Sequence, residues 1–195
     1  MATPAGQARN GEVFRTAAQL MVRQGYGGTS MSDIAKAVGM TKAGLYHHIS
    51  SKQDMLFQIL RHAMEGLERL VIEPVRGLSD PEERLREIIR LHVHGLFDCG
   101  LEFALLFPER RHLEPAQQKV ITRQVENYLG VIREALRELA EQGKLRDLDI
   151  PIAARHIVQT IAGIARWYTK DAGVTEARLI EQTVNFNMSA ILKDS

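Results

Sequence analysis

Residues 29–52 constrain the fold most strongly, because start and stop signals for short helices follow one another there. Ser30 and Asp33 have the S-x-x-D spacing that caps a helix at its N-terminus. Gly39 is typical of the left-handed turn that ends a helix, and Thr41 can cap the next one. Two short helices around a turn that contains glycine form a helix-turn-helix unit, whose second helix enters the major groove of DNA.

The second helix of this unit offers side chains that suit contacts with DNA. Hydroxyl, ammonium, phenol and imidazole groups can bind base edges and phosphates, and small residues let the helix backbone approach the bases. Two further polar residues stand at helix N-termini, where backbone amides help to bind phosphate. The candidate DNA contacts are Thr29, Thr41, Lys42, Ala43, Gly44, Tyr46, His47 and Lys52. The spacing alone also fits an ordinary pair of helices whose polar face is solvated.

Positive charge is concentrated in the same part of the chain. The whole sequence of 195 residues has a net charge of only +1. Residues 1–53 carry six Lys or Arg and two acidic residues, a net charge of +4, and the remainder has a net charge of −3. Binding to phosphates releases counterions, so a basic segment that coincides with the helix-turn-helix favours double-stranded DNA as a partner.

Three runs of residues in this segment resemble the signature of the TetR family of dimeric bacterial transcriptional regulators. They are TSMSDIA at 29–35, AVGMTKAGLYHHI at 37–49 and SK at 51–52. Ile49 stands where the family more often has Phe, and both residues are apolar. The resemblance implies DNA contacts at Thr41, Lys42, Gly44, Tyr46, His47 and Lys52, with Thr29 at the start of the second helix. It also implies a homodimer that binds a palindromic operator, usually as a repressor, and is released by a small-molecule effector.

Helical periodicity continues along the rest of the chain, and no useful stretch alternates in the manner of a β-strand. The sequence therefore predicts an all-α protein of about nine helices. A three-helix DNA-binding domain is expected over 1–53, and a larger helical domain for ligand binding and dimerisation over 54–195. Residues 1–8 are expected to form a polar tail, and Gly100 to separate two helices. The helices are expected at about 9–24, 30–39, 41–49, 52–73, 81–99, 101–107, 114–142, 149–171 and 175–193.

Several other classes of protein are disfavoured by what the sequence lacks. No stretch approaches the roughly 18–20 apolar residues of a membrane-spanning helix, and no signal-peptide core occurs near the start. Cys99 has no partner for an intrachain disulfide, so a cytoplasmic protein is expected. His92, His94 and Cys99 are too far apart on one helix to share a metal ion. Catalytic and phosphate-binding motifs are missing, so neither an enzyme nor a cofactor is expected.

The larger domain contains residues that could line a ligand site, since such sites are mostly apolar with a few polar anchors. The candidate ligand residues are His94, Phe97, Phe103, Phe107, Arg110, Arg111, Tyr128, His156, Gln159, Thr160, Arg166 and Trp167. The helical stripe through His156, Thr160, Gly163 and Trp167 fits the packing face of a dimer bundle equally well. Adjacent arginines such as Arg110 and its neighbour are often simply solvated.

The C-terminal part resembles, more weakly, the branch of the TetR family that controls fatty-acid and sterol breakdown and senses acyl-CoA thioesters. The resemblance rests on EFA at 102–104, ERR at 109–111 and ARWY at 165–168. It implies an acyl-CoA ligand, with a long pocket for the acyl chain and basic residues near the CoA phosphates. Two alternatives stay open. One is a regulator that binds cationic drug-like compounds, for which Glu102 and Glu126 are candidate anchors. The other is a helical carrier or enzyme on the same fold that does not bind DNA.

Overall fold

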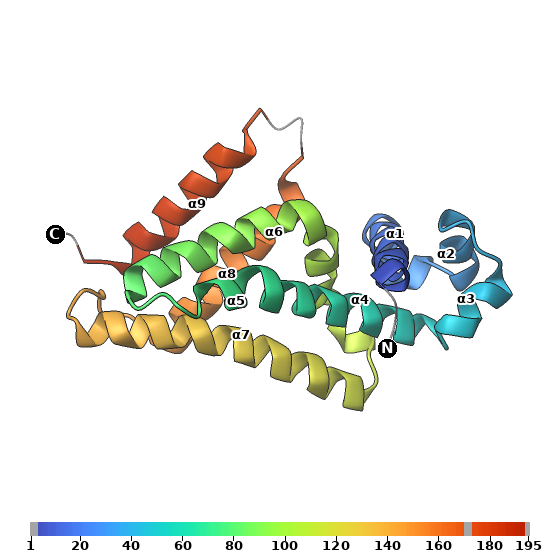
Figure 1. Cartoon of the computed structure of the whole chain (residues 1–195), viewed down its shortest axis with the longest axis horizontal. Coiled ribbons are helices and arrows are strands. Elements are labelled where there is room, and N and C mark those ends of the chain that lie inside the picture. Colours follow the sequence, from blue (N-terminus) through green and yellow to red (C-terminus); the bar gives the residue numbers. More distant parts are fainter. Residues whose placement is uncertain (1–3, 170–172, 194–195) are drawn as a thin grey trace. The chain divides into compact units, whose positions relative to one another are not determined.

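A computed structural model describes residues 4–169 and 173–193, except for the side chains of 4–10, 48, 98–101, 103, 104 and 106–108. These ranges form α-helices joined by short turns, as Figure 1 shows. The α-helices are α1 (Pro4–Gly28), α2 (Met31–Ala37), α3 (Lys42–His48), α4 (Lys52–Leu67), α5 (Glu73–Val75), α6 (Pro81–Glu109), α7 (Pro115–Glu141), α8 (Ile150–Trp167) and α9 (Glu176–Ile191). Two short segments complete them, the π-helix η1 (Glu68–Ile72) and the 3-10 turn η2 (Arg110–His112). The all-α prediction is confirmed.

Local capping signals place several helix ends where the sequence predicts them. The side chain of Asp149 accepts a hydrogen bond from the amide of Ile152 at the start of α8. Thr175 caps α9 in the same way. Gly143 follows α7 with a φ of 73°, a left-handed conformation that glycine adopts without steric cost.

Two expectations about helix boundaries were wrong. Helix α1 begins at Pro4, so residues 4–8 are helical and do not form a tail; proline is well suited to a first helical position. Helix α6 is continuous through Gly100, because an internal glycine costs a helix only about 1 kcal/mol relative to alanine. The helix expected over 52–73 forms as a continuous helical run from α4 through the π-helical turn η1 to α5.

The chain divides into two compact units that differ from a simple cut along the sequence. The first unit contains Met1–Glu65 and Leu101–Thr122, and the second contains Gly66–Gly100 and Arg123–Ser195. The first unit therefore combines α1 to α3, most of α4, the end of α6, η2 and the start of α7. Its fully buried side chains include Met21, Ile34, Leu45, Met55, Leu56, Ile59 and Leu60.

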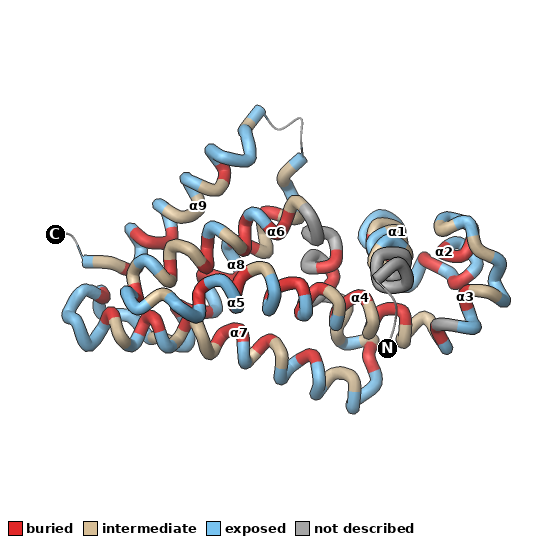
Figure 2. The backbone as a smooth tube through the Cα atoms, viewed as in Figure 1, coloured by how far each residue is buried: buried red, intermediate tan, exposed pale blue. Residues whose placement is uncertain are grey.

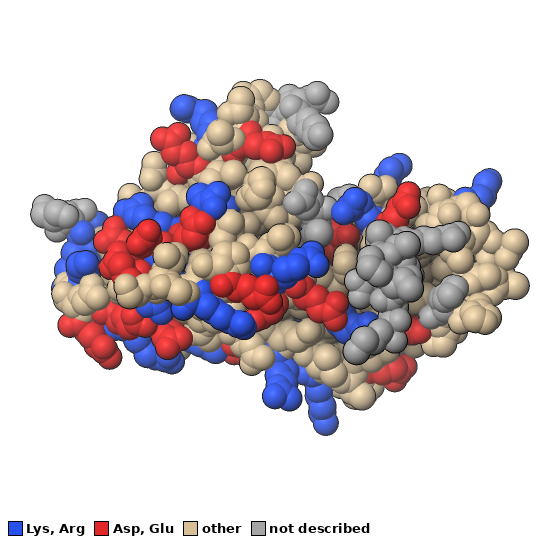
Figure 3. Space-filling view, viewed as in Figure 1, with Lys and Arg blue, Asp and Glu red and all other residues tan. Residues whose placement is uncertain are grey.

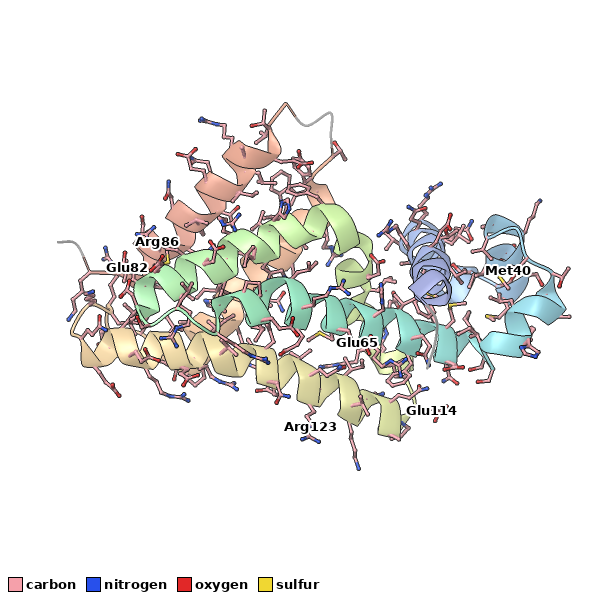
Figure 4. The ribbon with its side chains drawn as sticks, viewed as in Figure 1. Met40, Glu65, Glu82, Arg86, Glu114 and Arg123 are labelled. Carbon is pink, nitrogen blue, oxygen red and sulfur yellow. The ribbon has the colours of Figure 1, made fainter. Side chains whose placement is uncertain are left out.

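The second unit has its own core, formed by α6, α7 and α8 (Figure 2). Its buried side chains include Leu85, Ile88, Ile89, Ile132, Leu136 and Ile161. Arg84 in α6 binds both carboxylate oxygens of Glu138 in α7, at 3.0 and 2.6 Å. Glu82 and Arg86 form an ion pair along α6 and lie side by side in Figure 4. In the view of Figure 3, acidic and basic side chains are interspersed over this unit.

None of the helices in the described ranges is both long and apolar enough to cross a membrane.

Candidate nucleic-acid interface and ligand-binding residues

Helix α2 is fixed at its N-terminus by the predicted capping box. The hydroxyl of Ser30 accepts a hydrogen bond from the amide of Asp33 at 3.1 Å, and the Asp33 carboxylate accepts one from the amide of Ser30 at 2.9 Å. The side-chain and backbone hydrogen bonds from Ser30 lower the pKa of Asp33. Gly39, with a φ of 65°, then reverses the chain, and Met40 lies in the turn towards α3 (Figure 4).

Helix α3 is capped by Thr41, whose hydroxyl accepts a hydrogen bond from the amide of Gly44 at 3.0 Å. A Cβ at Gly44 would lie only 3.1 Å from that hydroxyl, so glycine fits the cap closely. Leu45 and Ile49 are buried, with Ile34 of α2. Burial of this face determines which side of the short helix is exposed.

The exposed side of α3 carries the predicted reading residues. Thr41, Lys42, Ala43, Tyr46 and His47 are all exposed. The ammonium of Lys42 lies 6.0 Å from the centre of the Tyr46 ring. A cation, a methyl group, a phenol and an imidazole thus lie on the exposed side of a seven-residue helix, and the hydroxyl of its N-cap residue precedes them. Such a face can bind phosphates and base edges.

The two remaining candidates for DNA contact, Thr29 and Lys52, are less exposed than the reading residues on α3. The side chain of Thr29 is only 1% exposed, and its hydroxyl donates to the carbonyl of Gly25 at 2.9 Å. Lys52 is half-buried, and its ammonium donates to the carbonyls of Tyr26 and Thr29 at 2.9 and 3.0 Å. Both side chains therefore bind the protein's own backbone.

Tyr128, a candidate ligand residue from the sequence, forms a buried polar pair with His92, which was not a candidate. The Tyr128 hydroxyl lies 2.7 Å from Nδ1 of His92, and both residues are buried between α6 and α7. Burial raises the pKa of Tyr128 and lowers the pKa of His92 to about 3. His92 was expected to be a hydrogen-bonded residue and not a metal ligand. Nothing in the local sequence indicated its partner, which lies 36 residues away.

The helix α8 candidates form a largely exposed stripe. His156, Gln159, Thr160, Arg166 and Trp167 are all exposed in the chain. Trp167 is 57% exposed, and Ile152 on the same helix is 54% exposed. On α9, Phe186 is 67% exposed, a residue that sequence reasoning missed because it belongs to a mostly polar helix face. The Thr160 hydroxyl donates to Asn187 at 3.0 Å, which joins the two helices.

The remaining ligand candidates are divided between the two units. In the second unit, His94 is exposed and Phe97 is half-buried, with its ring 5.5 Å from that of Tyr168 in edge contact. Arg110 is half-buried and Arg111 is exposed; both belong to η2 in the first unit. The side chains of Phe103 and Phe107 lie outside the described residues. Among the described residues, no group of His, Cys, Asp and Glu is arranged to hold a metal ion.

Comparison with known families identifies both halves of the chain. Residues 13–59 match the sequence model described as "Bacterial regulatory proteins, tetR family". Residues 78–191 match the model "Tetracyclin repressor-like, C-terminal domain". The chain belongs to the TetR family. The expectation that it is a transcriptional regulator and not an enzyme is confirmed by this membership, and so is the expected fold.

Individual relatives are also transcriptional regulators. The HTH-type transcriptional repressor KstR2 of Mycobacterium tuberculosis is 26% identical over 198 residues, which cover 97% of each chain. The HTH-type transcriptional activator FasR of Mycolicibacterium smegmatis is 25% identical, over 91% of this chain and 80% of FasR. The crystal structure of AibR in complex with isovaleryl coenzyme A and operator DNA is 31% identical, with a TM-score of 0.83. It covers 91% of this chain and 97% of AibR.

Proposed function

We propose that this TetR-family regulator is a cytoplasmic homodimer that represses transcription by binding a palindromic operator and is released by an acyl-CoA thioester. The proposal rests chiefly on the exposed face of α3, where Thr41 through His47 present base-reading and phosphate-binding groups on a capped helix. Release requires a ligand that has different affinities for the DNA-bound and free arrangements of the protein. The experiment that tests this function is selection of bound sequences from a randomised DNA pool. Retention of a palindrome supports it, and sequence-indifferent retention rejects it.

Loss of a reading side chain is expected to weaken operator binding without unfolding the protein. Lys42→Ala and Tyr46→Ala should each lower operator affinity by about tenfold or more, because a phosphate or base contact is typically worth about 1–3 kcal/mol. Both side chains are exposed, so the melting temperature should stay close to that of the wild type. Lys144→Ala, which removes an exposed lysine after α7, is the matched control. Wild-type affinity in both α3 variants would contradict the contact assignment.

Dimerisation is supported by the apolar side chains that the single chain leaves exposed. Ile152 and Trp167 on α8 and Phe186 on α9 are large and mostly exposed. Large exposed apolar side chains on two neighbouring helices favour an interaction surface there. From the sequence, the stripe on α8 fitted either a ligand site or the packing face of a dimer bundle. Its exposure in the single chain favours the bundle. Two recognition helices about 34–36 Å apart, as a dimer provides, read successive turns of the major groove.

An acyl-CoA ligand is supported by relatives and by the basic turn η2. AibR was crystallised with isovaleryl coenzyme A, and one end of such a ligand carries several phosphates. Arg110 and Arg111 in η2 could bind these phosphates, since guanidinium groups pair well with them. The test is a titration of the operator complex with acyl-CoAs of increasing chain length, with free CoA and fatty acids as controls. Dissociation by acyl-CoAs alone supports the proposal, and indifference to all of them rejects this ligand class.

A cationic ligand is a second candidate because of one buried acid. Glu102 is only 1% exposed, and burial raises its pKa. Glu126, the other acid considered, already binds Arg133 at 3.0 Å and Arg155 at 2.8 Å, so its charge is neutralised on the surface. Titration of the operator complex with lipophilic cations distinguishes a cationic ligand from an acyl-CoA. Release that depends on Glu102 would favour a cation, and release by acyl-CoAs alone would exclude it.

A further inference from the structure

The ammonium group of the half-buried Lys52 binds the protein's own backbone beside the helix-turn-helix. The pair of helices α2 and α3 is called the DNA reader. The ammonium donates to the carbonyls of Tyr26 and Thr29, and it lies 4.4 Å from the centre of the Tyr26 ring. Carbonyls at the end of a helix lack intrahelical partners, and a cation beside them is favourable. Two of the three N–H groups of the ammonium thereby bind one carbonyl in the last turn of α1 and one just after it.

The Tyr26 ring also contacts a segment far away in the sequence. His112 in η2 stacks on it, with the ring centres 4.6 Å apart and the planes inclined by 21°. Gln53, the neighbour of Lys52, donates its side-chain amide to the carbonyl of His112 at 3.0 Å. Gln118 in α7 donates to the carbonyl of Leu113 at 2.9 Å and so holds the turn from the other side. All of these residues belong to the first compact unit.

These contacts meet at both ends of the helix-turn-helix. The carbonyls that Lys52 binds belong to Tyr26 and Thr29, and Thr29 lies immediately before Ser30, the N-cap of α2. Lys52 itself is the first residue of α4 and follows the end of α3 by four residues. Lys52 joins the segment before α2 to the start of α4. These are the two ends of the helix-turn-helix, so the contact fixes the orientation of α2 and α3.

We infer that Lys52 is a positioning residue of the DNA reader and not a phosphate contact, and that the stacked pair Tyr26–His112 extends the reader to the turn η2. This inference rests on the proposed function. It replaces the role that resemblance to the family implied for Lys52, and it makes His112 one of the residues that position α3. A phosphate contact and a positioning residue both support binding, but only the contact releases a counterion when DNA binds.

The dependence of operator affinity on salt separates the two roles. Lys52→Met and Lys42→Met both remove a charge and keep an apolar stem. Lys42→Met should weaken binding and reduce the slope of log K against log salt concentration by about one unit. Lys52→Met should weaken binding by about tenfold and leave the wild-type slope unchanged. A slope reduced equally in both variants, or wild-type affinity in Lys52→Met, would overturn the inference.

Variants of the half-buried His112 test the stacked pair. His112→Ala should lower operator affinity severalfold, and His112→Phe should restore it, because a phenyl ring can take the place of the imidazole against Tyr26. Equal affinities of the two variants would overturn this part, whether or not Lys52→Met folds. Wild-type protein that selects no palindrome would reject the proposed function together with the inference. A wild-type protein that selects one, with a lowered salt slope in Lys52→Met, rejects only the inference.

Discussion

Replacing Phe186 with glutamate is expected to convert the protein into a monomer and to lower operator affinity by at least about 100-fold. The side chain is 67% exposed in the single chain, so the fold of the chain does not depend on it. In a dimer formed by α8 and α9 it would be buried, and an unpaired carboxylate there loses its hydration without a compensating partner. A monomer keeps only one of two half-site contacts, and each 1.4 kcal/mol of lost binding free energy corresponds to a factor of ten.

Sedimentation velocity and operator binding measure the two consequences separately. Val120→Glu is the matched control, since Val120 is also a large exposed apolar residue but belongs to α7. It should remain dimeric and bind the operator with wild-type affinity. A dimeric Phe186→Glu protein would contradict the proposed bundle and move the interface away from α9. A monomer that still binds the palindrome tightly would instead show that operator binding does not require the two α3 helices of a dimer.

The features predicted well from the sequence are those that depend on neighbouring residues. The caps at Ser30 and Thr41 both form, because each involves a side chain and an amide three residues away. The exposed face of α3 follows from the same local logic, since burial of Leu45 determines the orientation of so short a helix. Helix breaks were predicted less well, as the continuous α6 shows, because packing outweighs the small cost of a glycine.

Contacts between distant residues could not be predicted from spacing. The carbonyls that Lys52 binds lie 26 and 23 residues away, and Gln53 binds a residue 59 positions away. A lysine at a helix N-terminus suits a phosphate and a backbone carbonyl equally well, so its position alone does not choose between them. The same holds for Phe186, because an aromatic residue on an amphipathic helix is compatible with either burial or exposure until its neighbours are known.

Stability of the folded protein is expected to fall as the pH is lowered from 7 to 4.5, and a few kcal/mol of the loss should arise from His92 alone. Burial lowers the folded-state pKa of this imidazole to about 3, whereas an unfolded histidine titrates near 6.5. Between these values the unfolded chain takes up a proton that the folded protein does not, so the free energy of unfolding decreases with falling pH. Above pH 6.5 both states are neutral and the contribution disappears.

His92→Gln isolates this effect, because glutamine can still accept a hydrogen bond from Tyr128 but does not titrate. Urea denaturation at fixed protein concentration, from pH 7 to pH 4.5, should show a flatter pH dependence for the variant than for the wild type, by about 1.4 kcal/mol per pH unit below pH 6. Tyr128→Phe is the control. It removes the hydroxyl but leaves the imidazole buried, so it should destabilise the protein at pH 7 and keep the wild-type slope. Parallel pH profiles for wild type and His92→Gln would show that the imidazole titrates normally in the folded protein, and that the pair between α6 and α7 opens to water.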